Sequence, residues 1–330
     1  MASEVQKVIE RYRQLLEVKD AQQMRYMAQQ WLQVENALMS RIETLASYVT
    51  YMREQGQSVS MTSVLRLQQY KDLLGQARIE VKRYNQYASE QIRRNQVDLV
   101  QQGVNAAVEQ IGAAYMDANR PPEFITRIPV KAVEYMIGYA SDGSPLNTLL
   151  MKDYSGSIAR LTQTLINSTA QGINPRVTAR AMANDMAGNL QRALTIARTE
   201  QNRTFRTANT MAAKESGLVR TWIWRSALQE RTCIACLAQD GTEYPLEADL
   251  NDHPNGRCYK QWVIKGLQPI SAQSGLEWFQ TLGEDKQMDL LGPKRYEAWQ
   301  NGTNFRDFAA ITHNSVWGNT VQIAPLSTVV

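Results

Sequence analysis

The chain has 330 residues, of which 43% are apolar and 21% charged, and its formal net charge is +4 at pH 7. This composition is ordinary for a soluble protein of two or three domains, and the small net charge indicates that the chain as a whole is not an obligate nucleic-acid binder. The first residues lack a basic segment followed by an apolar core, and no apolar run reaches about 18 residues, so we expect neither a signal peptide nor a membrane span.

Residues 1–119 have the spacing of a long helical hairpin or coiled coil. Apolar residues recur every seven positions at Met24, Trp31, Leu38, Leu45 and Met52, and the offset positions hold Met27, Val34 and Tyr48, with Arg41 as the break. A second seam follows through Leu67, Leu74 and Val81 with Tyr70, Ala77 and Tyr84. Such heptads predict helices that bury one stripe. The stretch Gln55–Ser60 predicts the turn between them, with Ser60 as a candidate N-cap.

Prolines and glycines divide the middle of the chain. Arg120-Pro-Pro-Glu ends the first region, since proline disrupts a helix. We expect a linker with short helices over 120–157 and the helical part of a domain over 158–218. Helical spacing resumes at Ile158, stops at Gly172-Ile-Asn-Pro175 and leads to a helix from about Leu190 to Ser216, with Gly217 as its left-handed cap.

Positive charge concentrates in this helical part. The stretch from Arg176 to Arg231 holds ten Lys or Arg against four acids, a local excess of +6. Such an excess can face DNA or an acidic partner, and the alternative is a solvated helical face. We take four of these arginines as candidate nucleic-acid contacts: Arg192, Arg198, Arg203 and Arg206.

Residues 219–310 predict a small α+β domain. Val219–Ser226 alternates apolar and polar residues, which favours a strand, and Tyr259–Ile264 is its candidate partner. Six of the seven tryptophans lie beyond residue 220, which predicts a compact aromatic core. Asp240-Gly241 predicts a turn, helical spacing returns after Gly275, and 311–330 is expected to be an extended arm that docks on a neighbour. The fold class is therefore mainly α, with a long N-terminal hairpin and a small C-terminal α+β domain.

All three cysteines and one of the two histidines lie within 26 residues, as Cys233-x2-Cys236-x16-His253-x4-Cys258. Three thiolates and an imidazole are the ligands of a tetrahedral zinc ion, and clustered cysteines without a secretory signal favour a metal over disulfides. Four protein ligands leave no open position for water, so the predicted Zn site is structural. The alternative is a chance cluster of reduced thiols.

Several motifs follow one another in a set order. They are Gly172-Ile-Asn-Pro-Arg176, Ala197-Arg-Thr-Glu200, Glu215-Ser-Gly217, a strand with tryptophan, Arg231-Thr-Cys-Ile-Ala-Cys236, Asp240-Gly241, His253-Pro-Asn-Gly-Arg-Cys258 and Leu290-Leu-Gly-Pro-Lys-Arg-Tyr296. This order resembles the phage head morphogenesis family, the Mu F-like minor head proteins, over residues 155–310. The chain departs from that family at Gly256, where a cysteine is frequent, and at Glu230, where an aspartate is frequent.

The resemblance implies a structural minor head protein rather than an enzyme. It would act in head morphogenesis, associate in several copies with portal or capsid proteins, and reside in the virion after assembly in the host cytoplasm. Contact with packaged DNA is a further expectation. Two alternatives are a zinc-stabilised nucleic-acid-binding protein and a His-Asn type nuclease, the latter prompted by Asp252-His253-Pro-Asn255 and His313-Asn314. A nuclease needs a base besides the zinc ligand His253, which leaves His313.

Overall fold

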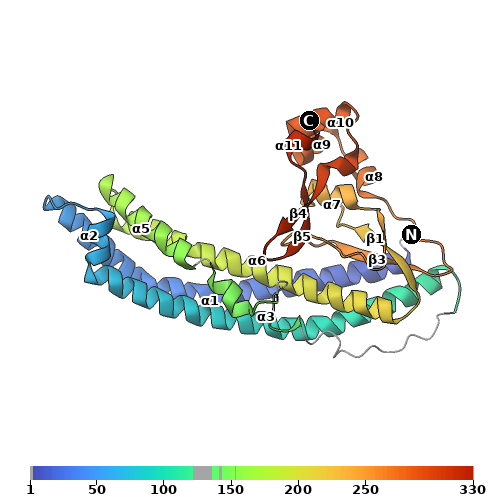
Figure 1. The fold of residues 1–330 in the computed structure, drawn as a ribbon, viewed down its shortest axis with the longest axis horizontal. Coiled ribbons are helices and arrows are strands. Elements are labelled where there is room, and N and C mark those ends of the chain that lie inside the picture. Colours follow the sequence, from blue (N-terminus) through green and yellow to red (C-terminus); the bar gives the residue numbers. More distant parts are fainter. Residues whose placement is uncertain (1–2, 122–135, 141–142, 153, 330) are drawn as a thin grey trace. The chain divides into compact units, whose positions relative to one another are not determined.

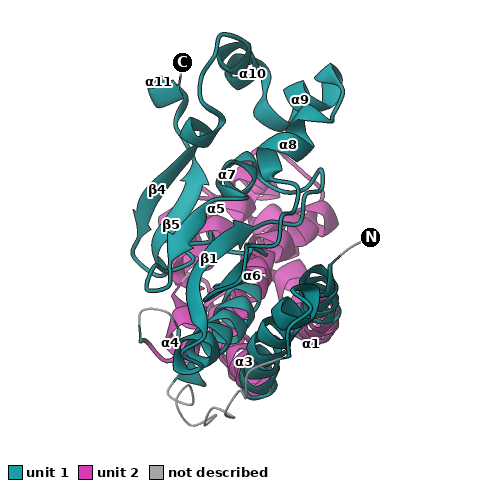
Figure 2. Cartoon of the chain, turned by 90° about the vertical axis from the view of Figure 1, so that its right-hand side faces the viewer, with its two compact units in different colours: residues 1–18, 95–143, 198–330 teal, residues 19–94, 144–197 magenta. Residues whose placement is uncertain are grey.

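The computed structural model describes residues 3–121, 136–140, 143–152 and 154–329 (Figure 1). The chain is mainly helical with a small sheet-containing C-terminal region, as predicted. It divides into two compact units, one formed by 1–18, 95–143 and 198–330 and the other by 19–94 and 144–197 (Figure 2). Each unit combines segments that lie far apart in the sequence. The division into five consecutive domains stays a prediction.

Three long helices, α1 (Glu4–Glu54), α3 (Gln68–Asp117) and α6 (Pro175–Glu215), each contribute to both units. The short helix α2 (Met61–Arg66) connects the first two, and Ser60 caps it as predicted, in a reciprocal pair with Ser63. Between α3 and α6 lie α4 (Leu146–Met151) and α5 (Tyr154–Ala170). The linker predicted over 120–157 falls partly outside the described residues, at 122–135, 141–142 and 153.

In the unit formed by 19–94 and 144–197, the buried stripe of α1 departs from the predicted heptads. Its residues are Met27, Trp31, Val34, Leu38, Ile42, Leu45 and Val49. The predicted Tyr48 is 38% exposed, whereas Val49 is fully buried. Steps of three and four residues that average nearly 3.7 suit a straight helix, and a strict seven-residue repeat would require supercoiling. The stripe therefore moves from Arg41 to Ile42 and from Tyr48 to Val49. Trp31 packs edge-on against Tyr84 of α3, with ring centroids 4.9 Å apart.

In the other unit, the start of α1 and the end of α6 are fixed by different caps. Asp117 at the end of α3 accepts hydrogen bonds from the backbone N–H groups of Glu4 and Val5, at 2.8 and 3.0 Å. These are orphan donors of the first turn of α1, and a carboxylate there also suits the helix dipole. At the far end of α6, Gly217 adopts φ of 68°, the left-handed cap predicted from the sequence.

A three-stranded antiparallel sheet follows α6 in the same unit. Its order is β2–β1–β3, with β1 at Val219–Arg225, β2 at Glu243–Pro245 and β3 at Tyr259–Ile264. Both β1 and β3 were predicted, and Trp222 of β1 lies opposite Trp262 of β3. The tryptophans are buried together with apolar residues of α3 and α6, so one face of the sheet packs against these helices.

The remaining elements follow in the same unit, and most of them contribute to a second apolar cluster. They are α7 (Ile234–Gln239), α8 (Gly275–Gln280), α9 (Glu284–Leu291), α10 (Pro293–Gln300), η2 (Phe305–Phe308), a hairpin of β4 (Ala309–Asn314) and β5 (Gly318–Ile323), and α11 (Leu326–Val329). The structure thus differs from the extended arm predicted over 311–330. Its first part pairs as a hairpin because Gly318, at φ of 72°, closes the turn, and Ala324 and Val329 are buried in the cluster.

Candidate metal centre

Helix α7 positions two of the predicted ligands. Cys233 is its N-cap, and its Sγ accepts a hydrogen bond from the backbone N–H of Cys236 at 3.4 Å. Because the two residues lie at the cap and in the first turn of one helix, both sulfurs face the same point. Cys258 immediately precedes β3, and His253 lies in the loop between β2 and β3.

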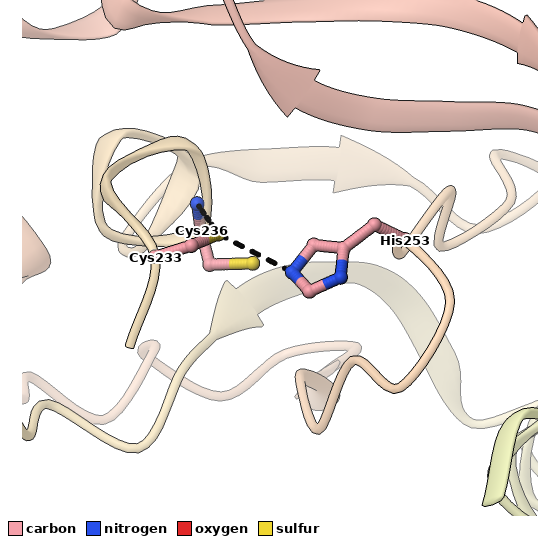
Figure 3. A group of neighbouring side chains, drawn as sticks. All are labelled: Cys233, Cys236 and His253. Carbon is pink, nitrogen blue, oxygen red and sulfur yellow. Dashed lines mark hydrogen bonds between the residues drawn. The ribbon is translucent and has the colours of Figure 1, made fainter. Parts of the chain in front are cut away.

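The loop places the ring of His253 next to the sulfur of Cys233. Its Nε2 lies 3.2 Å from Cys233 Sγ (Figure 3), and its Nδ1 lies 2.9 Å from the carbonyl oxygen of Pro254. A carbonyl can only accept a hydrogen bond, so Nδ1 carries a proton and Nε2 is turned toward the sulfurs. An orienting bond of this kind at the second ring nitrogen is typical of histidines that ligate metals.

The four predicted ligands lie close together, in two groups that share Cys236. One group is Cys233, Cys236 and His253, and the other is Cys236, Asp252 and Cys258; within each, the ligand atoms lie within 4.8 Å of one another. Cys236 and Cys258 are buried, whereas the His253 side chain is 25% exposed. The arrangement is compatible with a metal ion.

Hydrogen bonds within the cluster shift the pKa values of its cysteine and histidine side chains. A hydrogen bond with Cys236, followed by one with His253, lowers the pKa of Cys233 to about 5. The hydrogen bond with Cys233 in turn raises the pKa of His253 to about 9. The pKa of Cys236 is raised, chiefly by its hydrogen bonds with Cys233 and Cys258 and then by burial. In the absence of a metal, these shifts favour a thiolate at Cys233 and an imidazolium at His253, and they favour the neutral thiol of Cys236.

Asp252 is a part of the site that the sequence did not identify as a ligand or support. Its carboxylate, 1% exposed, accepts the backbone N–H groups of His253 at 2.9 Å and Cys258 at 3.0 Å. It also pairs with Arg206 at 2.6 Å. Asp252 thereby fixes the spacing between two predicted ligands. Its position directly before His253 was the available signal, but that position alone does not reveal the contact with Cys258.

Gly256, where the family that the sequence resembles frequently has a cysteine, leaves no room for a side chain. A Cβ at this position would overlap the Asp252 carboxylate. The space that a side chain at 256 would need is therefore occupied by Asp252, and a cysteine there would require the carboxylate to move. The loop as it stands is built for three cysteines, one histidine and a buried aspartate.

One face of α6 holds this loop in place. The contacts come from residues at helical spacing: Arg198 to Asn255 Oδ1 at 3.5 Å, Thr199 Oγ1 to Asn255 N at 3.1 Å, Asn202 to the Gly256 carbonyl at 2.9 Å and Arg206 to the same carbonyl at 2.9 Å. Arg198 and Thr199 of the Ala197-Arg-Thr-Glu200 motif thus help to hold the loop that carries His253.

The arginines predicted to contact nucleic acid are divided between the two units. Arg192 belongs to the unit formed by 19–94 and 144–197, where its Nε lies 3.5 Å from the Leu149 carbonyl. The other three lie in the unit that contains the cluster. Arg203 pairs at 2.6 Å with Glu200, which is fully buried. These contacts are internal to the chain, and nucleic-acid contact stays a prediction.

A cavity of about 600 Å³ adjoins the cluster. His253 and Asp252 line it on one side, and Lys214, Lys260 and Trp317 are among the residues on the others. Its charges are mixed in sign, so it does not select an anion by charge alone.

Residues 159–259 match the family model described as Phage Mu protein F like protein. This match confirms the resemblance predicted from the motifs, and it contains α6, β1, α7 and all four predicted ligands. It ends at the first residue of β3, short of residue 310. No curated protein and no solved structure matches the chain.

Proposed function

We propose that this chain is a minor structural protein of a phage head, present in several copies and associated with the portal vertex during head morphogenesis. The match of residues 159–259 to the Mu F-like family carries this proposal. The implied partners are portal and capsid proteins, and the implied location is the virion. None of the described helices combines the length and apolarity of a membrane span.

The cluster is proposed to hold a structural zinc ion through Cys233, Cys236, His253 and Cys258. Thiolates and a neutral imidazole suit Zn²⁺ better than the oxygen-preferring cations. With four protein ligands, the ion would have no open position for water, which is the arrangement of structural sites. It would tie α7, the loop that carries His253 and the start of β3 into one unit. Asp252 would act as its orienting support rather than as a fifth ligand.

A structural role is also favoured over the nuclease alternative. Among the residues that the structure describes, both groups of metal-ligating side chains include Cys236, and neither includes His313. The ring of His313 lies on the exposed hairpin, with Nδ1 3.2 Å from Asn319 Oδ1. A hydrolytic metal site needs a cation beside the base. The nuclease alternative is tested by incubating the chain with plasmid DNA and magnesium. Cleavage that disappears in His313→Ala would support it.

Contact with packaged DNA is a secondary proposal that depends on the +6 excess between Arg176 and Arg231. Phosphate contacts would give an affinity that falls steeply with salt. Retention of the chain on DNA cellulose at low salt, lost as salt is raised, would support it. Absence of retention at low salt would exclude it.

The head role is tested by removing the gene and analysing the heads. We expect particles with altered composition or reduced infectivity, restored by the wild-type chain, which should copurify with heads and portal. Complementation with Cys236→Ser separates the two proposals, because a variant that enters heads without zinc would confine the metal to stability. Heads of normal composition and infectivity without the chain would contradict the head role.

A further inference from the structure

In the part of the chain that the structure describes, the hairpin of β4 and β5 has one edge with a backbone partner and one, the outer edge of β4, without a partner. The backbone N–H of Val321 on β5 donates to the carbonyl of Asn251 at 2.6 Å, so the outer edge of β5 is occupied. That N–H points away from β4, and Val321 lies opposite Ile311. Since antiparallel pairs alternate between bonded and non-bonded, the N–H and C=O groups of Ile311 and His313 also point away from the hairpin. Figure 2 shows β4 as the outer strand.

This edge lacks the features by which proteins protect exposed strands. Ile311 is 65% exposed, and Thr312 and His313 are exposed beside it. No Asp, Glu, Lys or Arg occurs from Phe308 to Val330, and neither β4 nor β5 contains proline. Edge strands that must stay single are normally interrupted by charge, proline or a bulge. The edge of β4 is therefore suited to pair with another strand.

We propose that β4 pairs with β4 of a second copy of this chain, in an antiparallel arrangement about a two-fold axis at Thr312. In this register, Ile311 lies opposite His313 of the second copy, and His313 lies opposite its Ile311. The outward N–H and C=O groups of each opposed pair then form two hydrogen bonds, so the axis relates two such pairs and the two hairpins become one continuous sheet.

The strand is complementary to itself, which is the reason for choosing a second copy over another protein. Thr312 meets Thr312 of the second copy as a non-bonded pair, where side chains lie closest, and two threonines are compatible there. The nearest charged residue before the strand, Asp307, lies in η2 outside the paired segment, and β4 itself carries no acidic or basic residue, so no like charges oppose each other within it. The pairing needs no change in the hairpin itself.

Sedimentation velocity of the full chain over a range of concentrations tests the proposal. We expect a monomer and dimer equilibrium in the wild type, weakened at least about tenfold in Ile311→Pro, which removes an outward donor from each chain. Proline at an outward-facing edge position leaves the hairpin bonds intact. Ile311→Thr keeps the donor and is the matched control that should retain the dimer. Thermal unfolding of each variant verifies that it is folded.

A second pair of variants tests the register independently of proline. Thr312→Lys and Thr312→Glu each place like charges on the axis and should be monomeric alone. When mixed, they should form a heterodimer, because only residue 312 faces its own equivalent. A wild-type chain that is monomeric at every concentration, an unchanged dimer in Ile311→Pro, or a mixture that fails to associate would each overturn the proposal.

Discussion

Gly103 lies at a close contact between α3 and α6 within their shared unit, and replacing it by alanine tests that contact. A Cβ at Gly103 would overlap the carbonyl oxygen of Phe205 and lie 2.8 Å from the Cβ of Ala208. The Gly103 carbonyl also accepts a hydrogen bond from Asn209 Nδ2 at 3.1 Å. Since the overlapped atom belongs to the backbone, the two helices must separate to admit a methyl group.

The cost follows from these contacts. Overpacking of a buried contact costs about 1–3 kcal/mol, and weakening the bond from Asn209 adds roughly 1 kcal/mol. Alanine regains about 1 kcal/mol through its higher helix propensity. We therefore expect Gly103→Ala to lower the free energy of unfolding by about 1–3 kcal/mol.

Gly112 on the same helix supplies the matched control. A Cβ there would meet nothing within 4 Å, so Gly112→Ala should raise the free energy of unfolding by about 1 kcal/mol. Urea denaturation followed by tryptophan fluorescence measures both variants against the wild type. If Gly103→Ala proved as stable as Gly112→Ala, the close approach of α3 and α6 would be refuted.

Three further substitutions address buried polar contacts. Asp240→Ala should destabilise by about 3–5 kcal/mol in thermal or urea unfolding, because it leaves Arg225, whose side chain is 8% exposed, without its carboxylate; a loss below 1 kcal/mol would count against this pair. Tyr70→Phe should cost about 1 kcal/mol by removing its buried bond with Thr162 at 2.7 Å, and an unchanged unfolding midpoint would show that the bond contributes nothing. Asp252→Asn should weaken zinc binding roughly 10–100-fold in chelator competition, while unchanged affinity would deny Asp252 its supporting role.

Local signals explain what the sequence predicted correctly. The β1 strand follows from alternation over Val219–Arg225, and the end of α6 follows from Gly217, because both depend on near neighbours. The stripe of α1 was predicted only in part. Heptad spacing identified Trp31 and Leu38, but the choice between Tyr48 and Val49 depends on how far the helix supercoils, which the pattern alone does not specify.

The candidate site was likewise predicted only in part from the sequence. The spacing of cysteine and histidine singled out the four side chains that the fold brings together. Asp252 and its partner Arg206 were not recognised as support, since they lie 46 positions apart and meet only through the packing of α6 against the loop. Where the sequence predicted an extended arm over 311–330, the structure has the hairpin of β4 and β5, whose pairing depends on a turn at Gly318 that the pattern did not single out.

The proposed stabilisation of the small domain by a zinc ion is tested most directly by the metal content of the purified chain together with amide hydrogen exchange. We predict one zinc ion for each wild-type chain and none for Cys236→Ser, with loss of protection over 219–265 and intact protection in the helices of 19–94. His313→Ala, which changes the histidine outside the cluster, should keep its zinc. A zinc-free wild-type chain that is fully protected over 219–265 would contradict the account.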